Sequence, residues 1–185
     1  MPRVDRAFVE QALGAGLALA NTPLVEEMDH REGAEALVAT HRGGRQFQVA
    51  VVRGNLEVLA RAPLGGKVLA HANVRAVGAF KSMDLFDDGT RVHLLPVETE
   101  VVKRPVCGIL ALRYRRDTLS LIGEFGCKCW RRSAGGDDVD PFGYFKVLRD
   151  GKQLRIETVE LVGKSHYRWD EAQQAFLALL SPPGK

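Results

Sequence analysis

The sequence predicts a mainly β fold: an antiparallel curved sheet, barrel or sandwich of about nine or ten strands, with an N-terminal and a C-terminal helix packed on it (α+β). Short apolar runs recur roughly every ten residues and are joined by turn sequences such as Gly54-Asn55 and Asp150-Gly151, which are typical of tight hairpins. The strand patterns do not alternate with helical ones, which argues against a doubly wound α/β core.

The length of 185 residues indicates a single domain. We divide it into an N-terminal helix and acidic loop (1–34), an antiparallel β core (35–169), and a C-terminal helix and tail (170–185). A chain of this length buries roughly 70% of its unfolded surface, so a hydrophobic core is available without metals or disulfides. The net charge of +3 is compatible with an acidic partner but does not require one.

The longest predicted hairpin spans Val106–Arg132. A two-residue turn at Arg116-Asp117 gives the pairs Tyr114 with Leu119, Leu112 with Leu121, and Leu110 with Gly123. Two-residue periodicity then predicts one shared apolar face, formed by Leu110, Leu112 and Tyr114 on the first strand and by Leu119, Leu121, Phe125, Cys127 and Cys129 on the second. Gly123 and Gly126 are predicted points of bulging or bending.

Helices are predicted at both ends. Asp5 caps a first helix from about Arg6 to Ala18, which must pack on the sheet or close a barrel because two glycines weaken it. Asp170 caps a last helix from Glu171 to Leu180. The aromatic residues near this end also fit a strand-turn-strand, and the pattern leaves that alternative open; they are Tyr167, Trp169 and Phe176.

The other predicted strands lie in the β core; they are Ala36–Thr40, Gln46–Val52, Leu56–Ala60, Arg91–Leu95, Val97–Val102, Phe142–Leu148 and Gln153–Val162. Lys67–His71 and Val74–Phe80 are candidate strands, and His166–Trp169 is a short extended segment. Pro96 and Pro105 bracket one of these strands, which predicts an edge position or an interruption there.

The odd number of cysteines favours a reducing compartment. The predicted register turns Cys107 away from Cys127, so the favoured interpretation of Cys127 and Cys129 is two small buried hydrophobes. A bulge would shift one strand and allow a disulfide from Cys107 to either of them, and this alternative stays open. The spacing Cys127-Lys-Cys129 does not match a zinc site.

No catalytic signature is present in the sequence, so we predict no catalytic residues, no metal and no cofactor, and we rank enzymatic activity last. The five histidines have no ligand spacing, and no serine lies in a nucleophile elbow. A cysteine nucleophile near Lys128 lacks an identifiable base. Two carboxylate clusters do not match a calcium loop and are interpreted as solvated turns; they are Asp84, Asp87 and Asp88, and Asp137, Asp138 and Asp140.

Two basic groups are the candidate binding residues: Arg113, Arg115 and Arg116 at the hairpin tip, and Lys128, Trp130, Arg131 and Arg132 at the far end of its second strand. Strand geometry separates the groups by roughly 40 Å, so they form two patches. Trp130 with its basic neighbours resembles a site that stacks a base and holds phosphates, but a solvated strand end explains the same residues.

The favoured function is a non-enzymatic protein-interaction module of the inhibitor, immunity or adaptor type, with an unknown protein partner. One alternative is a β-barrel that binds a small apolar ligand, and another is nucleic-acid binding through the basic hairpin. No apolar run is long enough for a membrane span. A cytoplasmic location is favoured, and a mature periplasmic or secreted form stays open.

Overall fold

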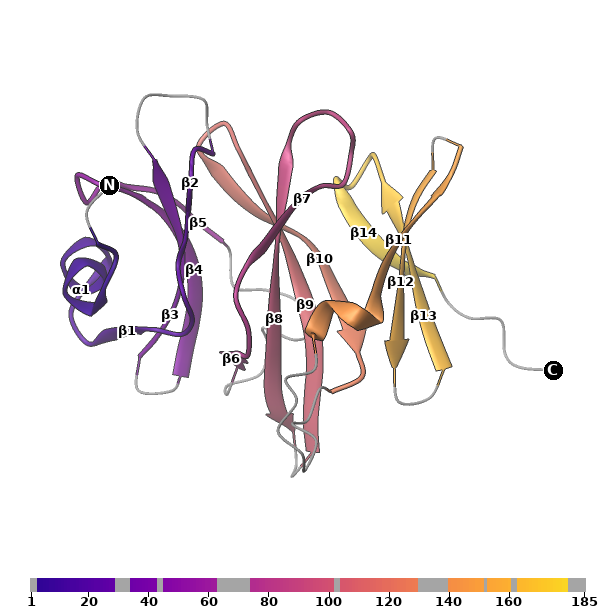
Figure 1. Ribbon diagram of the computed structural model, residues 1–185, viewed down its shortest axis with the longest axis horizontal. Helices are drawn as coiled ribbons and strands as arrows, with labels where there is room; N and C mark the ends of the chain where they lie inside the picture. The colour runs from indigo at the N-terminus through magenta and orange to yellow at the C-terminus, as the bar shows by residue number, and fades with distance from the viewer. Residues whose placement is uncertain are drawn as a thin grey trace.

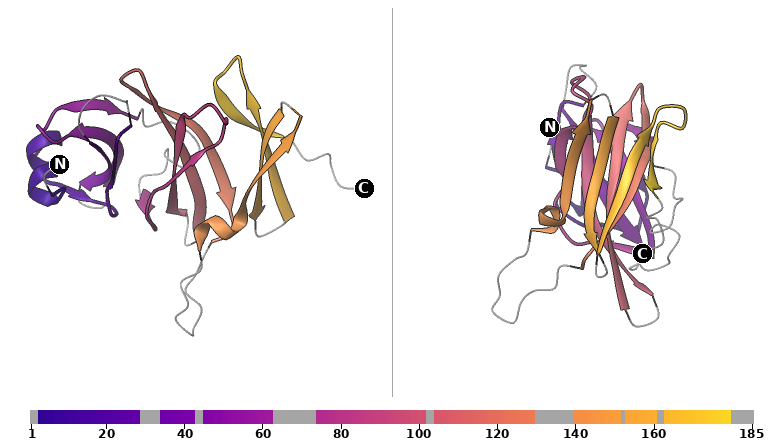
Figure 2. Two further views of the ribbon diagram at one scale, coloured as in Figure 1. Left: turned by 45° about the horizontal axis from the view of Figure 1, so that its top comes forward. Right: turned by 90° about the vertical axis from the view of Figure 1, so that its right-hand side faces the viewer.

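The computed structural model describes residues 3–28, 34–42, 45–62, 74–101, 104–129, 140–151, 153–160 and 163–179. Within these ranges, fourteen strands form three antiparallel sheets. The sheets lie side by side as three layers, and the helix α1 covers the outer face of the first layer (Figure 1, Figure 2). The mainly β class is therefore as predicted, whereas the described residues form a layered arrangement with no closed barrel and only one α-helix.

We name the layers sheet A, sheet B and sheet C. Sheet A follows α1 (Arg6–Leu13) and contains β1 (Leu17–Leu19), β2 (Leu24–Glu26), β3 (Glu35–Arg42), β4 (Arg45–Arg53) and β5 (Val58–Arg61). Sheet B contains β6 (Val74–Ala76), β7 (Lys81–Asp84), β8 (Arg91–Val101), β9 (Arg104–Arg115) and β10 (Thr118–Cys127). Sheet C follows a short 3-10 helix, η1 (Pro141–Tyr144), and contains β11 (Phe145–Asp150), β12 (Gln153–Glu160), β13 (Gly163–Asp170) and β14 (Ala175–Leu179).

The first helix begins as predicted but is shorter. Asp5 caps it, since its carboxylate accepts a hydrogen bond of 3.0 Å from the Phe8 amide. The helix ends at Leu13 because Gly14 has φ 124°, a backbone conformation that does not continue a helix. The chain then returns as β1 along β3, so the predicted extension to Ala18 is wrong. Phe8, Val9 and Leu13 pack on the outer face of sheet A.

The predicted C-terminal helix is wrong, and the strand-turn-strand alternative is correct. Residues 171–174 form a turn, and β14 pairs with β13 so that Trp169 lies opposite Phe176. Asp170 still accepts a hydrogen bond of 2.9 Å from the Gln173 amide, an interaction that can close a turn as well as begin a helix. Gln174 has φ 51° and interrupts helical geometry. Burial of Phe176 against sheet B outweighs the local helix propensity.

The two predicted strands around Pro96 form one continuous strand, β8, in the middle of sheet B. On one side β8 pairs with β9 along its whole length, and on the other it pairs with β7 and then with β6. The Pro96 carbonyl accepts a hydrogen bond from the Val77 amide, so the backbone groups of Pro96 face the break between β7 and β6. Pro96 lacks an amide hydrogen, but because of this break the sheet loses no hydrogen bond between strands. The predicted edge position is wrong.

The central hairpin has the predicted turn and the predicted first pairs, Tyr114 with Leu119 and Leu112 with Leu121. A bulge between Leu121 and Gly123 then shifts the register, so Leu110 lies opposite Glu124. Because one extra residue reverses the facing of every later side chain, β10 contributes to two cores. Leu119 packs between sheets A and B, whereas Phe125 and Cys127 pack between sheets B and C. The single shared apolar face predicted for β10 is therefore wrong.

Phe125 is fully buried at the centre of the contact between sheets B and C. Its ring lies 5.4 Å from Phe145, 4.9 Å from Tyr167 and 5.3 Å from Phe176, in each case edge to face. The same ring also covers the bulge, since a Cβ built on Gly123 would lie 2.6 Å from Phe125 Cζ. Glycine is therefore required at the bulge to admit the Phe125 ring.

We expect Gly123→Ala to lower the free energy of unfolding by about 1–3 kcal/mol, because the added methyl group displaces the Phe125 ring. Phe125→Leu should be less damaging in the Gly123→Ala background than in the wild type. Urea denaturation of the two single variants and the double variant measures this coupling. Gly143→Ala is the matched control, because its added Cβ meets no atom within 4 Å. Additive effects of the two substitutions would contradict the proposed contact.

Candidate functional site

The tip of the β9–β10 hairpin is the candidate site, and two cavities adjoin it. Arg116 and Asp117 form the tip with φ values of 50° and 58°, the conformation of a tight two-residue hairpin turn. Arg113 and Arg115 lie two residues apart on β9 and so share the face that, further down the strand, packs on sheet C. The three predicted arginines are thereby brought together.

The first cavity, which we call the arginine cavity, has a volume of about 470 Å³. Hydrogen-bond donors dominate its polar lining: Arg113, Arg115, Arg116, Thr118, Ser120, Gln173 and Gln174. Its apolar part is formed by Leu121, Ile122 and Ala175. No carboxylate belongs to the described lining, so the cavity matches an anionic group.

Arg113 anchors this cavity in the protein interior. Its side chain is 10% exposed, its guanidinium carbon lies 4.7 Å from the centre of the Phe86 ring, and one terminal nitrogen lies 3.6 Å from an Asp88 carboxylate oxygen. Its Nε is buried without a hydrogen-bond partner in the described structure. The positive charge of Arg113 is one of the causes that lower the pKa of Glu171, after the hydrogen bonds from Trp169 and Gln174.

Arg115 and Arg116 differ from most arginines nearby, because they are exposed and the described residues form no ion pair with them. Other arginines are neutralised: Arg91 by Glu26, Arg149 by Asp87 and Arg155 by Asp150. Guanidinium groups that form no ion pair with the described residues can bind an external anion through two parallel hydrogen bonds, as arginine favours.

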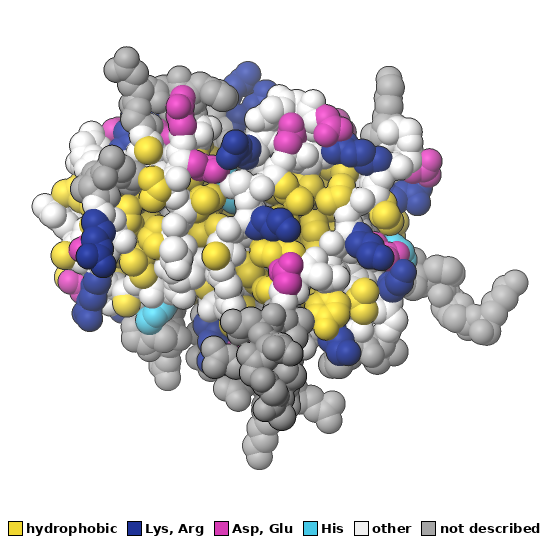
Figure 3. Space-filling view, viewed as in Figure 1, with side chains coloured by type: hydrophobic (Ala, Val, Ile, Leu, Met, Phe, Trp, Pro, Cys, Tyr) yellow, Lys and Arg dark blue, Asp and Glu magenta, His cyan; other side chains and the backbone are white. Residues whose placement is uncertain are grey.

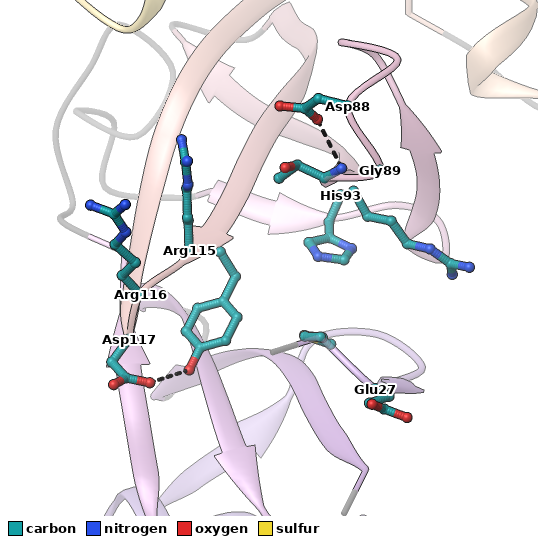
Figure 4. Close-up of a pocket in the computed structure, with 11 residues that line it drawn as sticks. Glu27, Asp88, Gly89, His93, Arg115, Arg116 and Asp117 are labelled. Carbon is teal, nitrogen blue, oxygen red and sulfur yellow. Dashed lines mark hydrogen bonds between the residues drawn. The ribbon is translucent and has the colours of Figure 1, made fainter. Parts of the chain in front are cut away.

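The second cavity, which we call the histidine cavity, lies on the other side of the hairpin tip and has a volume of about 430 Å³ (Figure 4). Arg115 and Arg116 line it as well, and the end of β2 contributes Glu27 and Met28. His93 reaches it from β8, and Figure 4 shows the His93 ring below Gly89, across from Arg115.

His93 belongs to a network that joins sheet A to sheet B. Ser82 Oγ lies 2.9 Å from His93 Nδ1 and donates a hydrogen bond of 3.1 Å to Glu26 Oε1. Arg91 Nη1 donates a hydrogen bond of 2.8 Å to the other oxygen of the same carboxylate. Since Ser82 gives its only hydrogen to Glu26, we assign the ring hydrogen to Nδ1, which donates to Ser82. In this tautomer Nε2 is an acceptor.

This network is not the arrangement of a serine nucleophile with its base. In such a triad the serine and the carboxylate contact opposite nitrogens of the imidazole. Here Ser82 Oγ and Glu26 Oε1 both approach Nδ1, at 2.9 Å and 3.3 Å. Burial lowers the pKa of His93 and outweighs the opposing effect of Glu26, so the ring is neutral at neutral pH.

The three cysteines lie close together at the opposite end of β10. Cys107 lies directly across from Cys127 and forms a disulfide with Cys129. The bulge that shifts the register lies at Ile122 rather than at Gly126, and the favoured interpretation of Cys129 as a reduced hydrophobe is wrong. Cys127 is a buried thiol. Its burial, with a smaller contribution from the charge of Glu160, raises its pKa to about 12.

The remaining predicted residues are not part of either cavity. Lys128 follows β10 at the end opposite the hairpin tip, where its amide donates to the Val159 carbonyl. The other three members of that patch, Trp130, Arg131 and Arg132, lie outside the described residues. The first carboxylate cluster forms a turn, as predicted: Asp84 accepts hydrogen bonds from two amides of the turn, and Asp88 accepts one from Thr90.

Sequence reasoning missed Gln173 and Gln174 in the arginine cavity and His93 in the second cavity. The glutamines were assigned to a helix, and the only signal for their true position was the strand-turn-strand alternative. His93 carried no signal, because its partners come from β2 and β7 and share no sequence spacing with it.

Comparisons with protein-family models, with curated proteins and with solved structures found no match for this chain. Among the described residues, no helix is long and apolar enough to cross a membrane.

The His93 pKa predicts how stability depends on pH. A histidine whose folded pKa lies below its unfolded value of about 6.5 stabilises the fold above that pH, and this contribution is lost as pH falls toward the folded pKa. Between about pH 7 and pH 5, urea denaturation should therefore show a smaller loss of stability for His93→Gln than for the wild type. Identical pH profiles for the two proteins would contradict the assignment.

The cysteine arrangement predicts a specific labelling pattern. Without reductant, iodoacetamide at neutral pH should label none of the cysteines in the native protein, because Cys127 is buried with a pKa of about 12. In urea it should label Cys127 alone, and all three only after reduction. Mass spectrometry of the intact protein counts the added groups. Labelling of Cys107 or Cys129 in urea before reduction would show that the disulfide is absent.

Proposed function

We propose that this protein is a non-enzymatic binding module that holds an anionic group of a protein partner in the arginine cavity. The observation that supports the proposal most directly is the convergence of three arginines on one cavity whose described lining contains no carboxylate. An acidic side chain of a partner would exchange its hydration for charge-assisted hydrogen bonds from Arg115 and Arg116.

The position of the cavity favours a macromolecular partner. It lies at a hairpin tip, where Arg115, Arg116, Gln173 and Gln174 are all exposed. Behind them, the buried guanidinium of Arg113 is held between the Phe86 ring and the Asp88 carboxylate. Exposed adaptable groups around a rigid buried anchor are typical of protein interfaces, in which arginine often contributes strongly to binding.

An acidic protein partner is better supported than nucleic acid. Single-stranded nucleic acid binding usually requires aromatic side chains for base stacking, and no aromatic residue belongs to the described lining of the arginine cavity. The second basic group begins at Lys128, at the other end of β10, so the described basic residues do not form one continuous track for a phosphate backbone.

The alternative of a barrel with an apolar ligand loses its support. The residues proposed to line such a cavity are instead divided between two packed cores. Leu110 and Leu112 are fully buried between sheets A and B, and Phe125 is fully buried between sheets B and C.

We also propose a compartment for the protein. The Cys107–Cys129 disulfide supports a periplasmic or secreted location over the cytoplasmic one, because reducing compartments rarely maintain structural disulfides.

The test uses fluorescein-labelled hexaglutamate as the acidic probe, with hexaglutamine and oligothymidylate as comparisons. Fluorescence anisotropy should show saturable binding of hexaglutamate, and Arg115→Glu with Arg116→Glu should weaken it by at least about tenfold. Hexaglutamine should not bind, because it lacks the negative charge.

The matched control is Lys146→Glu with Arg168→Glu, which changes the net charge equally at exposed positions of sheet C. It should have little effect on hexaglutamate binding. An equal loss of hexaglutamate affinity in the control variant would show that binding depends only on the net charge of the protein. Tighter binding of oligothymidylate than of hexaglutamate would favour the nucleic-acid alternative.

A further inference from the structure

We propose that the histidine cavity binds a small zwitterion, a compound with a carboxylate and an ammonium group such as a free amino acid. This site is separate from the protein-binding function proposed for the arginine cavity and does not depend on it. The two cavities share only Arg115 and Arg116, which line both sides of the hairpin tip.

Several charges around the histidine cavity are already engaged. Arg91 is ion-paired with Glu26 at 2.8 Å. Asp117 accepts a hydrogen bond of 3.1 Å from the Tyr114 hydroxyl. Asp88 accepts from the Thr90 amide and lies 3.6 Å from Arg113. The charges of Arg91 and Asp88 are thereby compensated within the protein, whereas Asp117 is held by a hydrogen bond from a neutral hydroxyl group.

The groups that remain available come from two sides of the cavity, the hairpin tip and the end of β2, and Figure 4 draws the guanidinium groups and the Glu27 carboxylate turned away from each other. On the hairpin wall, Arg115 and Arg116 provide guanidinium groups that form no ion pair with the described residues. On the other wall, the exposed Glu27 provides a carboxylate. One wall therefore suits an anion and the other a cation.

His93 adds a neutral acceptor to the wall of Glu27. Its side chain is 2% exposed, and both of its described partners approach Nδ1. With the hydrogen on Nδ1, the lone pair of Nε2 is left for a ligand. An ammonium hydrogen of a ligand in the cavity could donate to this nitrogen. An ammonium group has three hydrogens, enough for Nε2 and for the Glu27 carboxylate together.

The charges also select against simpler ligands. A metal cation would face the two arginines, and a dianion would face the carboxylate of Glu27. A compound with separated opposite charges matches both walls. The volume of about 430 Å³ lies within the range of small-molecule sites, and Met28 and Tyr114 offer apolar surface to a side chain.

The experiment tests the standard L-amino acids one at a time, at millimolar concentration, against the full chain. Thermal shift identifies those that bind, and calorimetry measures their affinity. We expect at least one to bind, and its decarboxylated amine and its deaminated acid each to bind at least about tenfold more weakly, because each lacks one charged contact. For phenylalanine these counterparts are phenethylamine and hydrocinnamate.

Substitutions then separate the two walls. Glu27→Gln should weaken binding of the amino acid by about tenfold and should not weaken binding of the deaminated acid, because it removes a negative charge. Arg115→Gln should weaken the binding of both the amino acid and the deaminated acid. Glu10→Gln, on α1 at the far side of sheet A, is the matched control and should change neither affinity.

Three outcomes would overturn the proposal. Failure of every amino acid to bind would show that the cavity does not accept a zwitterion. Equal affinity for the deaminated acid would reduce it to an anion site of the arginines, and equal affinity for the amine would reduce it to a cation site. Glu27 lines only the histidine cavity, so hexaglutamate that binds in the arginine cavity should bind equally well to Glu27→Gln.

Discussion

The one-residue bulge in β10 determines how the three layers pack. Before the bulge, Leu119 faces sheet A; after it, Phe125 and Cys127 face sheet C. Without the extra residue, Phe125 would point toward sheet A, and sheet C would lose the ring that contacts Phe145, Tyr167 and Phe176. Gly123 permits the bulge because it leaves room for that ring. Packing of sheet C against sheet B therefore depends on local geometry at two positions of one strand.

The candidate site is a consequence of this packing. The β13–β14 turn of sheet C brings Gln173 and Gln174 beside the hairpin tip, and the same packing places Phe86 against Trp169 and Phe176. Phe86 in turn lies under the guanidinium of Arg113. A change that displaces sheet C would thus remove one wall of the arginine cavity and the aromatic support of its buried arginine.

Local signals in the sequence predicted the local features of the structure. The turn at Arg116-Asp117, the first hairpin pairs and a bulge next to Gly123 all follow from two-residue periodicity and glycine geometry. The same reasoning placed Arg113, Arg115 and Arg116 together. It could not show that β10 contributes side chains to two cores. Whether a bulge reverses the direction of the later side chains depends on which sheet covers each face of β10. The C-terminal strand was missed for a similar reason, since Phe176 is buried by contacts with sheet B that local propensity does not encode.

The rigid part and the adaptable part of the site have different physical origins. Sheet B is buried on both faces, and β9 has a continuous buried run from Cys107 to Tyr114. Contacts with Phe86 and Asp88 already order the Arg113 side chain. Binding a ligand would therefore cost Arg113 little conformational entropy. Arg115 and Arg116 extend beyond the buried run and keep their rotamer freedom, so they can turn toward either cavity. The end of this central strand therefore combines one ordered arginine with two exposed arginines that form no ion pair with the described residues.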